Sequence, residues 1–319
     1  MTTADIVRSA KVLFPGEFAT SKIISELVLG TCSAADVCHF ASDQASRKTR
    51  VIAPVREAFD DCGGYKRMYR KSNGKVKLIL PPTMNPKIVR MTLREMCLQN
   101  YLGHHGIVPE LVSVRILKAG TLTQPVFECW QTMQAMDGTL MKWLSRPRKK
   151  VEIIDMLVQV LASLSRLSSI GIKHNDAKLD NIMYQESSPG IYKWKLIDLG
   201  LATVDSTRGC DVWFFMWWMW HRANDALRTA GVHKTCRFIL CVASVRVPAE
   251  LRSNIHCRRF MVSGKEHIDF CTIQNTGKSR QWFNGDMTKA DLYRIAQQML
   301  PPHVNIDELI SHIQGLKNM

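Results

Sequence analysis

The sequence lacks the features that mark an exported or membrane-spanning chain. Its first residues, MTTADIVRSAKVLF, have neither the basic flank nor the long apolar core of a signal peptide. The most apolar run, VWFFMWWMW at 212–220, is nine residues long and too short to cross a bilayer. We therefore expect an intracellular chain without a membrane span, located in the cytoplasm or the nucleus.

Paired cysteine spacings are also missing. The ten cysteines contain no CxxC pair, and in a chain without an export signal they are expected to be reduced, partly buried thiols. Cys32, Cys38 and His39 lie close together in the sequence and could be read as a metal cluster. Buried thiols are the favoured interpretation of this group.

Acidic residues are few relative to basic ones. The chain has 43 Lys and Arg against 28 Asp and Glu, which gives a formal charge of +15. Such an excess favours anionic partners, among them nucleic acid, acidic proteins, membrane surfaces and nucleotide phosphates. A diffusely basic surface is the alternative, because the only tight basic run is RPRKK at 146–150.

The order of patterns predicts a small mixed lobe followed by a larger helical one. Two extended runs flank Asn73-Gly74, a dipeptide typical of a tight hairpin. An amphipathic helix is expected at 86–102, with Ile88, Met91, Met96 and Leu98 among its apolar positions, and a strand at 125–136. A long helix at 151–171 with Gly171 as its stop precedes a strand-like run before Asp198, and two amphipathic helices at about 287–299 and 305–317 end the chain. Residues 1–55 and 232–285 give no firm motif.

The segment KHNDAKLDNIMY at 173–184 carries the residue types that phosphoryl transfer requires. That chemistry depends mainly on placement and charge neutralisation. Asp176 can orient an attacking hydroxyl, Lys178 can neutralise the phosphoryl group, and Asn181 can supply an oxygen to Mg²⁺. Asp198 lies 17 residues beyond Asn181 and offers a second metal carboxylate, followed by a glycine at 200 that permits a sharp turn.

This segment resembles the catalytic loop of protein kinases, H-R-D-x-K-x-x-N, and Asp198-Leu199-Gly200 resembles their D-F-G motif. The resemblance covers about residues 60–220. It implies an α+β, bilobal protein kinase-like fold with a small β-rich N-lobe and a larger, mainly helical C-lobe. The expected domains are 1–55 as an N-terminal extension or the start of the N-lobe, 56–136 as N-lobe and hinge, and 137–319 as C-lobe with a shortened activation segment.

The resemblance also implies roles for residues upstream of the loop. Lys77 is placed as the ATP-binding lysine, with Lys75 as the alternative, and Glu95, 18 residues later, as its ion-pair partner. Residues 134–137 are placed near the adenine. The glycine-rich loop is poor: Gly63 and Gly64 are the preferred candidates, and the segment LGTCSAADV at 29–37, which keeps only Gly30, is the other.

The pattern departs from the family at the activation segment. Asn175 stands where many kinases have Arg, and only 13 residues separate Asp198 from Asp211, which the resemblance places as the anchor of the catalytic loop backbone. No A-P-E-like segment lies between them, so activation by loop phosphorylation is not expected. His174 is expected to be structural, and the four tryptophans between 213 and 220 are expected to pack in the core.

These features predict a Ser/Thr-type protein kinase that uses ATP and Mg²⁺ and acts on a protein substrate. The abbreviated pattern is similar to kinases of large DNA viruses, which would place the chain in a host cell. Two other functions stay open. A small-molecule kinase of the aminoglycoside or choline type is favoured by the short segment after Asp198 and disfavoured by Lys178 and the helix around Glu95. A pseudokinase that serves as a binding module is disfavoured because all the expected catalytic residues are present.

Overall fold

The computed structural model describes ten stretches of the chain, and these form two compact units. The stretches are residues 3–47, 59–63, 66–70, 74–120, 125–204, 211–232, 258–262, 265–269, 310–311 and 313–314. Unit 1 comprises Met1–Asp137, Ile170–Ile172 and Lys195–Asp205. Unit 2 comprises Gly138–Ser169, Lys173–Trp194 and Ser206–Met319.

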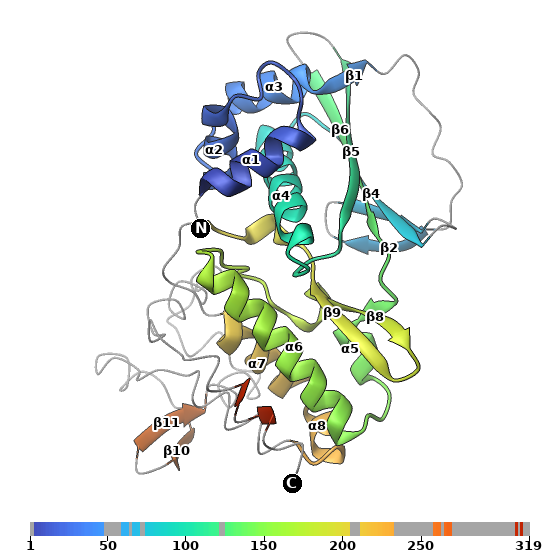
Figure 1. Cartoon of the computed structure of the whole chain (residues 1–319), viewed down its shortest axis with the longest axis vertical. Helices are drawn as coiled ribbons and strands as arrows, with labels where there is room; N and C mark the ends of the chain where they lie inside the picture. Colours follow the sequence, from blue (N-terminus) through green and yellow to red (C-terminus); the bar gives the residue numbers. More distant parts are fainter. Residues whose placement is uncertain are drawn as a thin grey trace, which may run out of the picture. The chain divides into compact units, whose positions relative to one another are not determined.

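Unit 1 is built on a six-stranded sheet with the order β1-β5-β6-β4-β3-β2 (Figure 1). Its strands are β1 (Ala45–Arg47), β2 (Phe59–Gly63), β3 (Lys66–Arg70), β4 (Lys75–Thr83), β5 (Leu111–Gly120) and β6 (Pro125–Gln134). The β3–β4 pair is antiparallel, and Gly74 before β4 has a φ of 69°. The expected hairpin is therefore confirmed, although Asn73 itself lies outside the described residues.

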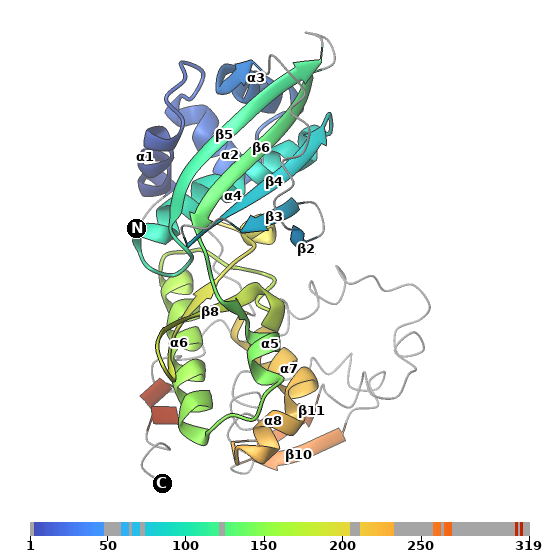
Figure 2. The ribbon, with the colours of Figure 1, turned by 90° about the vertical axis from the view of Figure 1, so that its right-hand side faces the viewer.

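The two faces of this sheet differ in burial. Val76 lies opposite Met133 and Leu80 opposite Cys129, and all four side chains are buried. Successive side chains of a strand point to opposite faces, so Lys77 belongs to the other face. Figures 1 and 2 show the helices of unit 1 gathered on one side of the sheet. Helix α4 contacts β4 and β6, so the buried side chains of these strands belong to that side. The face that carries Lys77 is the uncovered one.

In the part of unit 1 that the structure describes, four α-helices complete the core. They are α1 (Thr3–Leu13), α2 (Ser21–Leu29), α3 (Ala34–Asp43) and α4 (Pro86–His104). The side chains of Thr20, Ser33 and Asn85 accept hydrogen bonds from backbone N–H groups of the first turns of α2, α3 and α4, which satisfies donors that a helix start leaves open. Gly30 ends α2 in the left-handed conformation, with a φ of 80°.

Helix α4 lies between the sheet and the three N-terminal helices, and it contacts all three. The helix expected at 86–102 is thus confirmed, but it is buried on more than one face. Met96 and Leu98 are fully buried, whereas Ile88 and Met91 are only half-buried. Polar bonds join α4 to the N-terminal helices: Arg90 Nη1 donates to the Cys32 carbonyl over 2.9 Å, Arg94 Nε to the Val28 carbonyl over 2.8 Å, and Asn100 Nδ2 to the Ser9 hydroxyl over 2.7 Å.

Unit 2 is mainly helical in its described part. Its helices are α5 (Leu140–Leu144), α6 (Lys150–Ser169), α7 (Asp211–Arg222) and α8 (Asn224–Thr229), and its strands are β7 (Gly138–Thr139), β8 (Ile182–Ser188), β9 (Ile191–Leu196), β10 (Arg258–Val262) and β11 (Lys265–Asp269). The long helix expected at 151–171 is confirmed as α6, and Gly171 follows it with a φ of 74°. The short helix α5 begins directly after Gly138-Thr139.

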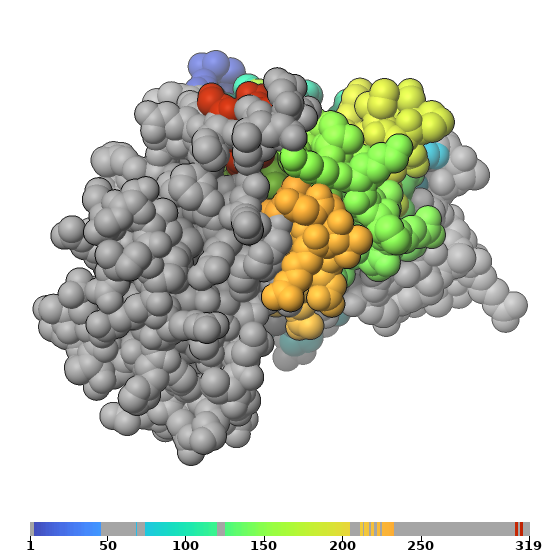
Figure 3. All heavy atoms as spheres, turned by 90° about the horizontal axis from the view of Figure 1, so that it is seen from below, coloured from blue at the N-terminus to red at the C-terminus, as the bar shows by residue number. Residues whose placement is uncertain are grey.

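The core of unit 2 includes α6 and α7, which contact each other. Leu157 and Leu161 of α6 are fully buried, as are Phe215, Met216 and Met219 of α7. Figure 3 shows the orange residues of the α7–α8 segment beside green residues of the α5–α6 segment at the surface. The helices expected at 287–299 and 305–317 lie outside the described residues, apart from four helical positions between 310 and 314.

The expected α+β class is confirmed, with a first unit that combines a six-stranded sheet with helices and a second unit that is mainly helical in its described part. Over the part of the chain that the structure describes, every helix is too short or too polar to cross a membrane.

Candidate active site

The loop after α6 brings three of the predicted site residues together within unit 2. Asp176 is 5% exposed, and its Oδ2 accepts a hydrogen bond from Lys178 Nζ over 2.7 Å and another from Asn181 Nδ2 over 2.8 Å. Asn181 Nδ2 also donates to the Asp176 carbonyl over 2.9 Å. The amide of Asn181 therefore has a fixed orientation. Its oxygen accepts no hydrogen bond from any described residue, so it is available as a ligand atom.

The same loop is held from beneath by Asp211, the first residue of α7. One carboxylate oxygen accepts the His174 N–H over 2.7 Å, and the other accepts the Asn175 N–H over 2.8 Å. Asn175 has a φ of 62°, a left-handed conformation that Asn tolerates better than most residues. The expected anchoring of the loop backbone by Asp211 is confirmed.

His174 has a structural environment. It is fully buried, and its Nδ1 accepts the backbone N–H of Asp176 over 3.3 Å. A ring nitrogen that accepts a backbone hydrogen bond beneath the loop fixes the position of the neighbouring carboxylate. This agrees with the expected structural role.

A second group of predicted residues meets within unit 1, where Asp198-Leu199-Gly200 packs against α4. The short helix η2 (Leu199–Leu201) contacts α4, and Leu199 is fully buried. A Cβ added at Gly200 would lie 3.3 Å from Asp198 Oδ1 and 3.9 Å from Glu95 Oε2. The backbone of Gly200 therefore runs close to both carboxylates, which leaves little room for a side chain.

Asp198 and Glu95 differ strongly in exposure. Asp198 is exposed and has a φ of 62°, an uncommon conformation for a residue other than glycine. Left-handed backbone costs such residues about 1–2 kcal/mol, and it is concentrated at functional sites. Glu95 is 6% exposed on α4. The exposed carboxylate of Asp198, on a strained turn, is suited to binding a cation. The buried carboxylate of Glu95 is suited to positioning a neighbouring group.

Lys77 contacts Trp130 in this structure. Its Nζ is 4.2 Å from the centre of the Trp130 ring, on the sheet face that the helices leave uncovered. No ion pair joins Lys77 to Glu95 among the described residues, so the expected pairing is not formed in this structure. Lys75 shares the face of Lys77 because the two are two positions apart on β4. The spacing of 18 residues is compatible with an ion pair between Lys77 and Glu95. Because side chains alternate between the two faces of β4, however, both lysines lie on the face opposite the helices.

The glycine candidates fall differently on the fold. Gly63 ends β2 and pairs with Lys66 of β3, so it lies at the connection between these two strands, ahead of β4, which carries Lys77. Gly64 lies outside the described residues. The alternative at 29–37 is wrong, because Gly30 terminates α2 and Ser33 begins α3. At the expected hinge, the Gln134 N–H donates to the Glu110 carbonyl and the Ala135 N–H to the Gly74 carbonyl.

Trp130 is a residue of this region that the sequence did not single out. It stacks with Lys77 and, at 5.7 Å, with Arg115, and its Nε1 donates to Glu128 over 2.5 Å. No pattern in the sequence indicated its position, because polar Gln131 occupies the buried face of β6 and apolar Trp130 the other.

Comparisons with known proteins find similarity to protein kinases over part of the chain. Mitogen-activated protein kinase hog1 of Aspergillus glaucus is 30% identical over 130 residues, which are 40% of this chain and 32% of that protein. The protein of the same name from Botryotinia fuckeliana is 30% identical over 134 residues, or 42% and 34% of the two chains. This similarity supports the protein kinase-like superfamily.

The kinase-like similarity is partial in extent. The chain spans about a third of the length of the curated relatives it matches. No protein-family model matches the sequence. A solved structure titled "WaaP in complex with acyl carrier protein" has a TM-score of 0.37 and 13% identity over 58% of this chain and 82% of that one, a score too low to establish a shared fold. The similarity to kinases of large DNA viruses stays a prediction.

Proposed function

We propose that the chain is an ATP-dependent phosphotransferase, a Ser/Thr-type protein kinase that transfers the γ-phosphate of ATP to a protein hydroxyl. The observation that carries the proposal is the Asp176, Lys178 and Asn181 cluster, whose side chains are joined by hydrogen bonds of 2.7 and 2.8 Å. A carboxylate, an ammonium group and an amide fixed in this way supply the placement that phosphoryl transfer needs.

Each residue of the cluster has a distinct role in this proposal. Asp176 orients the acceptor hydroxyl and takes its proton at the carboxylate. Lys178, held on Asp176, places a positive charge where negative charge develops on the transferred group. Asn175 in place of Arg, together with the short segment before Asp211, supports activity without loop phosphorylation.

Mg²⁺ and ATP are the proposed ligands, because the side-chain types present suit them. The Asn181 amide oxygen, with no hydrogen bond from the described residues, and the exposed Asp198 carboxylate are the hard oxygen ligands that Mg²⁺ prefers. When bound, the metal ion neutralises phosphate charge. Lys77, Glu95, Gly63 and Gly64 are proposed to contact the nucleotide. Because Lys77 lies over Trp130 here, this role requires its side chain to leave the ring.

The test is transfer from labelled ATP with Mg²⁺ to a generic basic protein, a peptide panel and a set of amines and sugars. Transfer to Ser or Thr of the protein or peptides is expected, and it should be abolished by Asp176→Asn. Asp180→Asn is the matched control, because Asp180 is exposed in the same loop and its side chain takes no part in the hydrogen bonds of the cluster. Equal transfer by wild type and Asp176→Asn would refute the mechanism, and transfer to the small acceptors alone would favour the small-molecule kinase.

Nucleotide binding separates the remaining alternatives. An ATP-induced rise in melting temperature is expected for wild type in Mg²⁺, with a smaller rise for Asp198→Asn. Lys77→Ala and Lys75→Ala compare the two candidate lysines, of which Lys77→Ala is expected to weaken ATP binding more. A wild-type chain that shows neither transfer nor a thermal shift would favour a binding module.

A further inference from the structure

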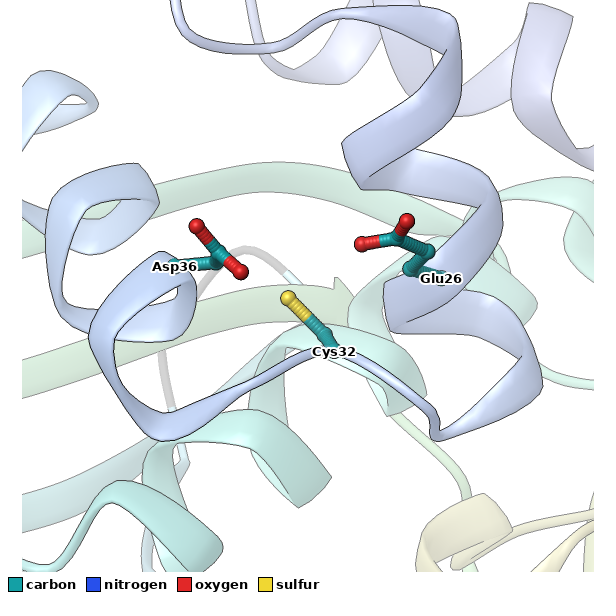
Figure 4. Close-up of side chains that lie close together, drawn as sticks. All are labelled: Glu26, Cys32 and Asp36. Carbon is teal, nitrogen blue, oxygen red and sulfur yellow. The ribbon is translucent and has the colours of Figure 1, made fainter.

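A group of ligand-bearing side chains lies in unit 1 among the N-terminal helices, outside the residues proposed for phosphoryl transfer. Glu26 comes from the last turns of α2, Cys32 from the connection between α2 and α3, and Asp36 from the first turn of α3. One carboxylate oxygen of each acid and the Cys32 sulfur all lie within 4.8 Å of one another. Figure 4 shows the sulfur directed between the two carboxylates.

The environment of Cys32 singles it out from the other cysteines. The residue is 1% exposed, yet its sulfur forms no hydrogen bond within the described part of the chain. Apolar burial is common for a free cysteine, but Cys32 lies beside two carboxylates, of which Asp36 accepts a hydrogen bond from the Ser33 hydroxyl over 2.6 Å. Two like charges this close repel each other, and a cation between them removes the repulsion.

Nearby cations offset this negative charge only in part. Arg90 donates to the Cys32 backbone carbonyl over 2.9 Å, so its guanidinium is committed to the backbone near the cluster. Lys22 lies 4.0 Å from Glu26, but its side chain is 83% exposed. Two carboxylates, a thiolate and the Arg90 guanidinium would together carry a charge of minus two, which one divalent cation neutralises.

We propose that Glu26, Cys32 and Asp36 form a zinc-binding site that joins α2 to α3. Zinc accepts sulfur and carboxylate oxygen together, whereas Mg²⁺ and Ca²⁺ prefer oxygen alone. Ligand atoms on one tetrahedral zinc lie roughly 3.5 Å apart. The three atoms thus need to approach by only about an ångström, which side-chain rotation provides, and water completes the fourth position.

The site would act on more than its own loop. The Cys32 carbonyl is bonded to Arg90, and the Val28 carbonyl, two residues after Glu26, is bonded to Arg94. Both arginines belong to α4. A zinc ion that fixes the α2–α3 connection therefore also fixes two acceptors that hold α4, and it stabilises unit 1 by binding the folded state.

The test is titration of the full chain, prepared with a chelator, with Zn²⁺ alone and with Co²⁺ alone. We expect one Zn²⁺ bound through this site, a rise in melting temperature, and a near-ultraviolet thiolate-to-cobalt absorption band. Cys32→Ser should remove the band and weaken Zn²⁺ binding at this site at least 10-fold. Cys38→Ser is the matched control, because Cys38 lies on α3 outside the cluster, and it should bind as wild type does.

Two further variants keep the result decisive if Cys32→Ser folds poorly. Glu26→Gln and Asp36→Asn alter half-buried residues, and each should weaken Zn²⁺ binding while the band persists. An excess of Mg²⁺ should not compete, which separates this site from the proposed Mg²⁺ ligands Asn181 and Asp198. Zinc affinity that is equal in wild type, Glu26→Gln and Asp36→Asn would overturn the proposal, as would the absence of the band in wild type.

Discussion

The replacement of Asp211 by asparagine tests how the candidate catalytic loop is held. Asp211 is 6% exposed, and its two oxygens accept the N–H groups of His174 and Asn175 over 2.7 and 2.8 Å. Asparagine keeps the shape but turns one acceptor into an NH₂ group that faces a backbone N–H. One buried donor then loses its partner, and the other keeps only a neutral acceptor.

The expected loss of stability follows from these two bonds. A hydrogen bond to a charged group contributes roughly 1.5–3 kcal/mol, and an unsatisfied buried group costs about 1–3 kcal/mol. We therefore expect Asp211→Asn to lower the free energy of unfolding of unit 2 by about 3 kcal/mol. Because the two bonds also hold Asn175 in its left-handed conformation, transfer at a temperature where the variant is folded should fall about 100-fold, the usual effect of misplacing a catalytic group.

Urea unfolding followed by tryptophan fluorescence measures the first effect, and the labelled-ATP assay measures the second. Asp225→Asn is the control, since Asp225 is exposed on α8, and its stability should stay within about 0.5 kcal/mol of wild type. A loss of less than about 1 kcal/mol in Asp211→Asn, with unchanged transfer, would show that the loop does not depend on this carboxylate.

Three further predictions concern unit 1. Burial raises the pKa of the Cys97 thiol to about 12, so the folded state favours the neutral thiol. The free energy of unfolding should therefore be constant below about pH 9 and fall above it by up to about 1.4 kcal/mol per pH unit. In urea unfolding, Cys97→Ala should show a smaller fall between about pH 9 and 10.5. Arg94→Met should lower the free energy of unfolding by about 1–3 kcal/mol, because the Val28 carbonyl loses its bond; an unchanged urea midpoint would contradict this. Gly30→Ala should lower the free energy of unfolding by about 1–2 kcal/mol in the same measurement, because Gly30 has a φ of 80°. The nearest atom to an added Cβ is 3.8 Å away, so the loss comes from backbone strain and not from a steric clash.

The sequence was most informative where a pattern is local. The spacing of apolar residues along α6 and the end of the helix at Gly171 depend on residues only a few positions apart, and so does the hairpin before β4. The loop from His174 to Asn181 was readable for the same reason, because its polar residues bond to one another. Asp211 was placed by resemblance, 35 residues beyond Asp176, and the structure confirms its bonds to the loop.

The N-terminal helices could not be placed because their partner is distant in sequence. Helices α1, α2 and α3 have 11, 9 and 10 residues, lengths that are marginal without tertiary packing. Their apolar faces become meaningful only against α4, which begins more than 40 residues after α3 ends. The Glu26, Cys32 and Asp36 cluster was missed for a related reason, since it depends on how the α2–α3 connection turns.

The direction of Lys77 also required the fold. A spacing of 18 residues to Glu95 is compatible with a contact, but contact depends on which face of β4 the lysine occupies. That face is set by the register with β6, where Lys77 lies opposite Thr132 and Val76 opposite the buried Met133. A shift of one residue in this register would place Lys77 on the buried face and Val76 on the opposite one.

The enclosure of α4 has a consequence for motion. The helix that carries Glu95 is covered by the sheet and by α1, α2 and α3, and arginines along it are bonded to backbone carbonyls of the N-terminal segment. Such a helix cannot tilt or slide by itself: the three short helices must travel with it or detach. Any displacement of Glu95 is therefore coupled to residues 3–43, whose packing and hydrogen bonds with α4 would have to change with it.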